Sequence, residues 1–230
     1  MDGPDTPPAR RSAGALTPFV ESAGRVAAGV FGALSAVRRR RIFHPVGTAY
    51  DATLVVHGGR RGAVLLDEPH RRACVVRLSR GVCLRAPRPD ILGLALRVPD
   101  AYGPGAHQDL LMATAGSGPV LRSVLGVSRS PDRGHYSSVL PYRIGDGYTY
   151  IGARPMSPGT SGRRFALEVA PPLGNWAEVG FVELGAPWDQ EGSDALRFNP
   201  LFTGGGIEPV GVLQTLRRRA YAGSQAARPQ

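Results

Sequence analysis

Short hydrophobic runs of strand length fill the middle of the chain. In residues 47–57, 92–98 and 109–115, apolar side chains alternate with other residues or follow one another directly, and turn sequences such as HGGRRG and DAYGPGA lie between the runs. This spacing is typical of β-strands. We expect further strands at residues 62–68, 73–79, 137–145, 148–155, 164–170 and 178–185. Within these, YRIGDGYTY (142–150) predicts a tight hairpin over Gly-Asp-Gly.

Long helical patterns occur only near the two ends. Residues 17–40 fit an amphipathic helix with arginines at its C-terminal end, where cations suit the helix dipole, and residues 209–224 fit a second helix. A short helix is expected at 119–126. Eight or nine closely spaced strands between terminal helices predict a mainly β (α+β) fold, an antiparallel β-barrel with N- and C-terminal helices. Residues 1–16 are expected to be a disordered tail and 17–230 a single domain.

The chain carries a net charge of +10, and all 28 of its basic residues are arginine. A charge of this size suggests binding to nucleic acid. The sequence has no zinc-ligand spacing, recognition helix or aromatic RNA motif to support such binding, so we expect no specific nucleic-acid partner. Arginine is also the residue best suited to bind carboxylates and phosphates through its planar fork.

The cysteine content and the apolar segments indicate the cellular location of the protein. Cys74 and Cys83 are too few for a disulfide framework and are not spaced like metal ligands, and Cys74 is expected in the core. The start of the chain lacks the apolar region of a signal peptide, and the apolar stretch 25–37 is too short to span a bilayer. We therefore expect a cytoplasmic protein without a transmembrane segment, with peripheral membrane contact by this helix as an alternative and homo-oligomerisation left open.

Two features near the first strands carry polar groups suited to chemistry. His44 lies in RRRIFHPVG (39–47), where a basic helix end gives way to a strand, and is either a surface residue or held over a ligand by the nearby arginines. Arg77 and Ser79 are two apart on a predicted strand and so share a face. We expect that face to be the inner one, where both side chains need partners, although Val75 and Val76 leave an outward face open.

The third feature lies in the last predicted helix. Arg217 and Tyr221 are four residues apart and stack on one helical face. A guanidinium beside a phenol oxygen stabilises the phenolate and lowers its pKa from about 10. Such a phenolate can bind ferric iron, but the same spacing is common on surface helices. His57, His70 and His135, in contrast, lie in turn-like contexts and are expected in solvent.

Together these motifs resemble the haem catalase superfamily, in particular its small members. The segment RIFHPVG is similar to the family's RVVHAKG, and VVRLSR is similar to VRFST. The segment PDILGLALRV resembles DPRGFAVKF, with Asp90 and Gly93 at the matching spacing, and RRRAY resembles the family's Arg-x-x-x-Tyr helix. The order of the motifs agrees over the region from Arg41 to Tyr221.

The resemblance implies haem b as cofactor and gives each matched residue a role. His44 would be the distal catalytic histidine, oriented by Ser79, and Arg41 and Arg77 would contact the haem propionates. Tyr221 would be the axial iron ligand, activated by Arg217.

The family's distal asparagine has no clean counterpart in this chain. Gln108 and Asp109 are the nearest polar residues, and Asp109 is taken as the catalytic candidate. The implied function is a catalase or peroxidase acting on hydrogen peroxide. The alternatives are a haem enzyme acting on an organic hydroperoxide or small metabolite, and a non-catalytic barrel that binds haem or another apolar ligand.

Overall fold

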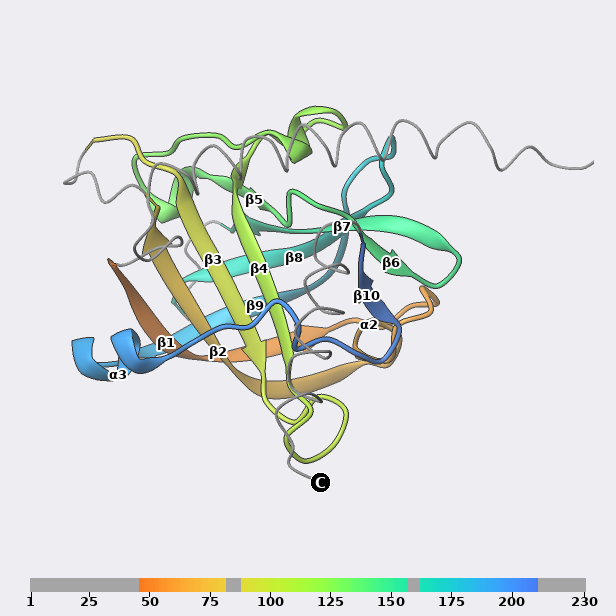
Figure 1. Ribbon diagram of the computed structural model, residues 1–230, viewed down its shortest axis with the longest axis horizontal. Helices are drawn as coiled ribbons and strands as arrows, with labels where there is room; N and C mark the ends of the chain where they lie inside the picture. Colours follow the sequence, from red (N-terminus) through yellow and green to blue (C-terminus); the bar gives the residue numbers. More distant parts are fainter. Residues whose placement is uncertain (1–45, 82–87, 157–161, 211–230) are drawn as a thin grey trace, which may run out of the picture.

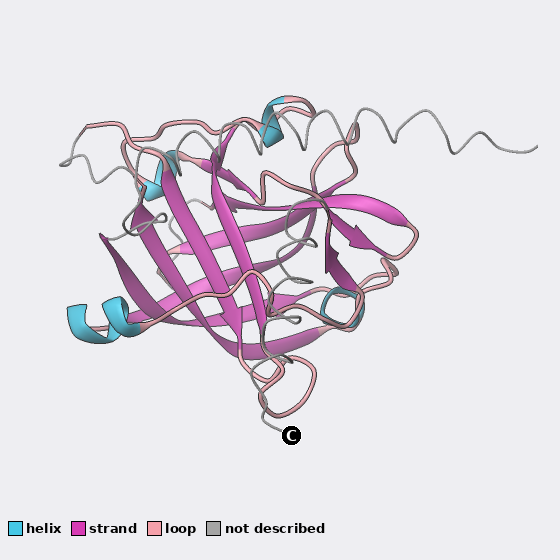
Figure 2. Cartoon of the chain, viewed as in Figure 1, coloured by secondary structure: helices cyan, strands magenta, loops and turns pink. Residues whose placement is uncertain are grey.

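The computed structural model describes residues 46–81, 88–156 and 162–210. β-Strands are the main regular structure of these residues, and the helices are few and short (Figure 2). The strands are β1 (Val46–Val56), β2 (His70–Arg80), β3 (Leu92–Val98), β4 (Gln108–Ala115), β5 (His135–Ser137), β6 (Tyr142–Ile144), β7 (Gly147–Pro155), β8 (Arg164–Ala170), β9 (Ala177–Pro187) and β10 (Ile207–Pro209). The helices are α2 (Val64–Asp67), α3 (Gln190–Ala195) and the 3-10 turns η1 (Leu121–Ser123) and η2 (Pro131–Arg133).

Eight of the described strands close into an antiparallel barrel. The order around the barrel is β7-β5-β4-β3-β2-β1-β9-β8, and β8 pairs with β7 to complete the ring (Figure 1). The short strands β6 and β10 extend the sheet beside β7. Closure leaves no unpaired strand edge within the ring. The predicted mainly β antiparallel barrel is therefore confirmed. The predicted helix at 17–40 lies outside the described residues, as does the predicted helix at 209–224 beyond residue 210, and Pro209, its expected first residue, belongs to strand β10.

Alternating side chains fill the barrel interior, because successive residues of a strand point to opposite faces. On β2 the inward residues are Cys74, Val76 and Leu78, and on β3 they include Leu94 and Leu96. All belong to one buried hydrophobic cluster to which the other strands of the ring also contribute. Cys74 is 4% exposed, and burial raises the pKa of its thiol to about 12, so its expected place in the core is confirmed.

The hairpin predicted at YRIGDGYTY is present. Ile144 pairs with Gly147, so Gly145 and Asp146 form a two-residue turn between β6 and β7. Gly145 has φ +56°, the left-handed value that the first central position of a type II′ turn requires. Glycine at this position therefore sets the register of the hairpin.

Two predicted strands are wrong in part. Residues 62–68 contain the helical turn α2 instead of a strand, because the Asp67 carboxylate accepts hydrogen bonds from the backbone N–H groups of Arg61, Gly62 and Ala63. The adjacent Leu65 and Leu66 are both buried, which an alternating strand would not allow. The predicted strand 137–145 is broken between β5 and β6 by a turn in which Val139 has φ +61°.

The helix α3 lies against the outside of β1. Asp189 caps it by accepting a hydrogen bond from the Gly192 N–H. The buried hydroxyl of Ser193 accepts from the backbone N–H of Ala49 at 2.9 Å. This bond fixes α3 over the first half of β1, beside the residues considered next. No helix in the described ranges is long and apolar enough to cross a membrane.

Candidate functional site

Arg77 and Ser79 share one face of β2, but that face is the outer one. Val76 and Leu78 point into the barrel core, so the residues that alternate with them point outward. The expectation of an inner face is therefore wrong, because the apolar residues of β2 already fill the interior. Both polar residues are nevertheless shielded: Ser79 is 9% exposed, and the Arg77 side chain is 12% exposed.

Very small residues surround this pair on the outer face of β1 to β4. In one cross-strand row Ser79 lies between Gly47 and Gly93, and in the next row Arg77 lies between Ala49 and Ala95. Ala113 of β4 extends the Ser79 row. We call these residues the outer small-residue face: Gly47, Ala49, Arg77, Ser79, Gly93, Ala95 and Ala113. Leu111 of β4 extends the Arg77 row, and Ala49 is fully buried beneath α3. The Ser79 row, made of Gly47, Ser79, Gly93 and Ala113, carries no large side chain and allows a flat group to approach the backbone closely.

Gly47 shows how tightly this face is built. A Cβ atom at Gly47 would lie 2.6 Å from the Leu78 carbonyl oxygen and 2.7 Å from the Ser79 Cβ. It would also lie 3.1 Å from the Arg77 Cζ, so the arginine side chain extends across Gly47. Glycine at this position therefore makes room for both polar side chains.

Arg77 places a positive charge at the edge of the face. Its guanidinium lies 3.9 Å from the half-exposed carboxylate of Asp194 on α3. Burial lowers the pKa of Arg77 from its usual value; Asp194 opposes this shift and the nearby Arg197 adds to it. An arginine remains charged at any ordinary pH. The site thus contains a shielded cation that lies beside the Asp194 carboxylate.

The hydroxyl of Ser79 is only weakly engaged. It donates to the Gly93 carbonyl oxygen across 3.5 Å, the long end of the hydrogen-bond range. Ser79 can therefore turn its hydroxyl toward another partner on the outer face at little cost.

The structure does not bring Asp109 next to Ser79. Ser79 pairs with Gly93, whereas Asp109 pairs with Arg97, four residues further along β3 and so about 13 Å away. Both carboxylate oxygens of Asp109 bind Arg97, at 2.7 and 2.6 Å, and one also accepts from the Asn199 N–H. This fully buried carboxylate attaches the segment after α3 to the barrel.

Gln108 is also engaged with protein groups. It points to the inner side of β4, where its Oε1 accepts from the Tyr102 hydroxyl at 2.9 Å and from the Gly204 N–H at 3.3 Å. Its Nε2 donates to the Asp109 carbonyl oxygen at 3.1 Å. Neither candidate for the distal polar residue thus presents a free amide or carboxylate to the outer small-residue face.

The other predicted site residues lie outside the described residues. They are Arg41, His44, Arg217 and Tyr221. Their roles therefore remain predictions.

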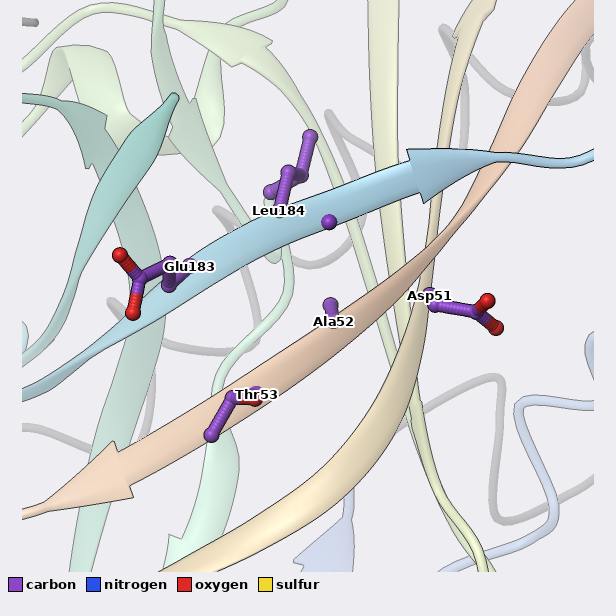
Figure 3. Close-up of a pocket in the computed structure, with 6 residues that line it drawn as sticks. Asp51, Ala52, Thr53, Glu183 and Leu184 are labelled. Carbon is purple, nitrogen blue, oxygen red and sulfur yellow. The ribbon is translucent and has the colours of Figure 1, made fainter. Parts of the chain in front are cut away.

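A shallow recess opens elsewhere, at the irregular pairing between β1 and β9. It has a volume of about 300 Å³ and is lined by Asp51, Ala52, Thr53, Glu183, Leu184 and Gly185. Figure 3 shows its two carboxylates directed away from one another. The indole N–H of Trp188 donates to Asp51 at 2.7 Å, and Arg164 donates to Glu183 at 2.8 and 3.1 Å. Without convergent polar groups, this recess is not a candidate active site.

His135 is not a solvated histidine, contrary to the expectation from its turn-like sequence. Its side chain is 11% exposed, and its Nε2 lies 3.0 Å from one carboxylate oxygen of Glu168. The other oxygen of this carboxylate accepts a hydrogen bond from Arg154 at 2.9 Å. The ring of Trp176 packs 4.8 Å away. Burial raises the pKa of Glu168, but the hydrogen bonds from His135 and Arg154 outweigh that effect and the pKa is lowered overall. The cluster stabilises the wall formed by β5, β7 and β8.

Sequence reasoning missed the small residues and the acid that complete the site. Alternating Gly and Ala in GTA (47–49) and LGLAL (92–96) could have revealed the face, since one side of each strand lacks bulk. Asp194 and Ser193 gave no such signal, because only the packing of α3 brings them to Arg77 and Ala49. In the described parts of the chain, no group of three or more His, Cys, Asp or Glu residues could hold a metal ion.

The sequence matches no protein family profile and no curated protein. The fold, however, is similar to that of catalases. Catalase A from Saccharomyces cerevisiae is 12% identical with a TM-score of 0.59, and the match covers 86% of this chain and 63% of that protein. A fungal catalase is 13% identical (TM-score 0.58; 93% and 64% covered), and a bacterial catalase is 11% identical (TM-score 0.58; 86% and 60% covered). The chain thus has a catalase-like β-barrel fold and spans 60% to 64% of the length of these proteins.

Proposed function

We propose that this protein binds haem b over the outer small-residue face and acts on a peroxide as a catalase or peroxidase. Hydrogen peroxide is the preferred candidate substrate, and an organic hydroperoxide is the alternative. The observation that carries the proposal is the face itself. Gly47, Gly93 and Ala113 leave the Ser79 row without large side chains, and Arg77 extends across Gly47 as a shielded cation. A flat, largely apolar macrocycle with two carboxylates fits this combination.

Chain connectivity supports a place for His44 at the same site. His44 comes two residues before Val46, and Val46 pairs with Arg80, the neighbour of Ser79. Two residues span at most about 7 Å between Cα atoms. The proposal therefore requires His44 to reach the weakly held Ser79 hydroxyl from a point only two residues before β1.

The proposed roles follow from these groups. Haem supplies, when bound, an iron centre that reacts with peroxide. His44 takes the proton from one peroxide oxygen and returns it to the other, because a neutral imidazole both accepts and donates. Ser79 orients the imidazole by bonding one ring nitrogen. Arg41 and Arg77 would bind the propionates, and Tyr221, kept as phenolate by Arg217, would hold the iron, as the resemblance to haem catalases implies.

The first test is haem binding by the purified full chain. Titration with haemin should give a Soret band, and Tyr221→Phe should weaken binding or change the spectrum, because the ring remains but its ligating oxygen is lost. Arg217→Leu should act in the same direction to a smaller extent. Tyr148→Phe, which alters a half-exposed tyrosine in the β6–β7 hairpin, is the matched control. Absence of a Soret band in the wild type would end the proposal.

The second test separates binding from turnover. His44→Ala should reduce peroxide consumption by about 10²–10⁴-fold, the usual contribution of a placed proton-transfer group, while haem occupancy stays near that of the wild type. Ser79→Ala should reduce turnover less, because it only disturbs orientation. The rate of consumption of hydrogen peroxide and of an organic hydroperoxide is measured for the wild type and each variant, and the peroxide that is consumed faster identifies the substrate class.

A non-catalytic haem carrier is the second candidate function. The observation that favours it is the state of Gln108 and Asp109, which are both engaged by protein groups instead of facing the proposed peroxide site. A haem-loaded wild type that consumes neither peroxide faster than free haemin would support this alternative.

A further inference from the structure

An exposed apolar ridge lies in the segment between β4 and β5, which runs along the upper edge of the barrel in Figure 1. We define the apolar ridge as Val120, Leu121, Val124 and Val127, which are 62%, 57%, 50% and 69% exposed. Single exposed apolar side chains are common, but four within eight residues are a feature of interaction sites.

Buried contacts fix the ridge in place. Arg122, between Leu121 and Ser123, is fully buried and donates to the carbonyl oxygens of Pro171 and Gly174 at 2.9 and 2.6 Å. Its guanidinium also stacks 4.7 Å from the centre of the Trp176 ring. Because the turn is anchored by Arg122 and by the Ser123 hydroxyl, which lies 2.8 Å from the Tyr150 hydroxyl, the apolar residues on either side are held outward.

Exposed arginines flank the ridge. Arg129 and Arg133 follow it in sequence and are exposed. Arg88 is also exposed and lies on the neighbouring segment, because Asp90 and Ser128 form a backbone bridge.

The nearby acids do not cancel this charge. Asp90 binds Arg80, and Asp132 binds Arg163. The surface beside the ridge is therefore both apolar and positively charged.

The first residue of β1 lies on the same side as the apolar ridge. Val46 pairs with Arg80, Arg80 pairs with Leu92, and Asp90 bridges to Ser128 at the end of the ridge. The sequence that precedes Val46 includes RVAAGVFGALSAVRRRR (25–41), which is likewise apolar and basic. The start of β1 and the end of the apolar ridge therefore lie on one side of the barrel.

We propose that this side of the protein docks on an anionic lipid bilayer. The apolar ridge enters the boundary between headgroups and acyl chains, and Arg88, Arg129 and Arg133 bind lipid phosphates. Apolar residues flanked by arginines match that surface in both polarity and charge. A second protein copy carrying the same positive charge would instead be repelled. The inference is independent of haem binding.

Co-sedimentation with vesicles tests this docking surface. The full chain should bind vesicles of phosphatidylcholine with phosphatidylglycerol, and bind pure phosphatidylcholine vesicles far more weakly. Val120→Asp/Val124→Asp should lower the partition coefficient at least about tenfold, because two apolar contacts are lost and two negative charges are added. Val127→Asp is a second variant at the most exposed position. Val64→Asp, equally exposed on α2 beyond the other end of β1, should bind like the wild type.

The charge contribution is tested separately. Arg129→Gln should weaken binding about fivefold, whereas Arg60→Gln, in the loop before α2, should have no effect. Binding should also weaken with added salt. Circular dichroism verifies that each variant is folded.

Three outcomes would overturn the proposal. The wild type could fail to distinguish anionic from neutral vesicles. The ridge variants could bind as tightly as the wild type, which would assign binding to residues before Val46. Light scattering could show a wild-type dimer that the ridge variants convert to a monomer, which would identify a second copy as the occupant of the ridge.

Discussion

The guanidinium of Arg77 lies 3.9 Å from the carboxylate of Asp194, so a helix that follows the barrel in sequence supplies a counter-charge to an arginine of its second strand. A ligand carboxylate that binds Arg77 must compete with Asp194. Because Asp194 is half exposed, it can give up this contact and return to water. The pair therefore provides a direct test of the proposed propionate site.

Asp194→Asn should increase haemin affinity by about two- to fivefold, because the competing charge is removed while the shape is kept. Arg77→Leu should reduce haemin affinity by at least about tenfold. Both affinities are measured by Soret titration, with Asp146→Asn in the β6–β7 turn as the control. Unchanged affinity in Arg77→Leu would remove Arg77 from the haem site.

Gly47→Ala should destabilise the protein and impair haem binding together. The added Cβ would lie within 2.7 Å of the Leu78 carbonyl oxygen and the Ser79 Cβ, and overpacking of this kind costs about 1–3 kcal/mol. Gly147→Ala is the matched control, because a Cβ at this strand position meets no atom within 4 Å. Urea unfolding and haemin titration of both variants check the prediction. Equal behaviour of the two would show that the outer small-residue face tolerates bulk.

Asp109→Asn distinguishes a structural from a catalytic carboxylate. Because Asp109 is buried and bound by both ends of the Arg97 fork, its loss should cost about 3–5 kcal/mol of unfolding free energy. Peroxide turnover per bound haem should then change little. A variant of wild-type stability with greatly reduced turnover would instead make Asp109 the distal catalytic group.

Glu168 should make stability depend on acid pH. Its pKa is lowered in the folded protein, since His135 and Arg154 outweigh the effect of burial. The carboxylate therefore contributes stability above its ordinary pKa of about 4.3, and this contribution is lost as pH falls through the lowered folded value. Glu168→Gln should lower the unfolding free energy at neutral pH by about 2–3 kcal/mol and flatten its decline in acid. Urea unfolding across the acid range checks this, and a curve parallel to the wild type would contradict it.

The pattern of apolar residues and turns was enough to predict the barrel. Apolar residues recur at strand spacing, and turn sequences separate them, so local preference and burial agree for β1, β3, β4, β7, β8 and β9. It also placed Arg77 and Ser79 on one face of a strand, because the two-residue period of a strand allows no other arrangement. Where a local side-chain interaction competes with the pattern, as at Asp67 beneath α2, the sequence pattern predicted the wrong element.

Only the tertiary structure decided which face of β2 is the outer one and what surrounds Arg77. Strand alternation is symmetrical, so Val75 and Val76 could not indicate the side on which the barrel would close. Closure settles it, because the residues at even positions of β2 and β3 meet those of the other strands in one core. The same closure gathers Gly47, Ala49, Gly93 and Ala95 onto one outer surface and lets Asp194, more than a hundred residues away in sequence, approach Arg77. Such contacts depend on register between distant strands, which short-range spacing does not encode.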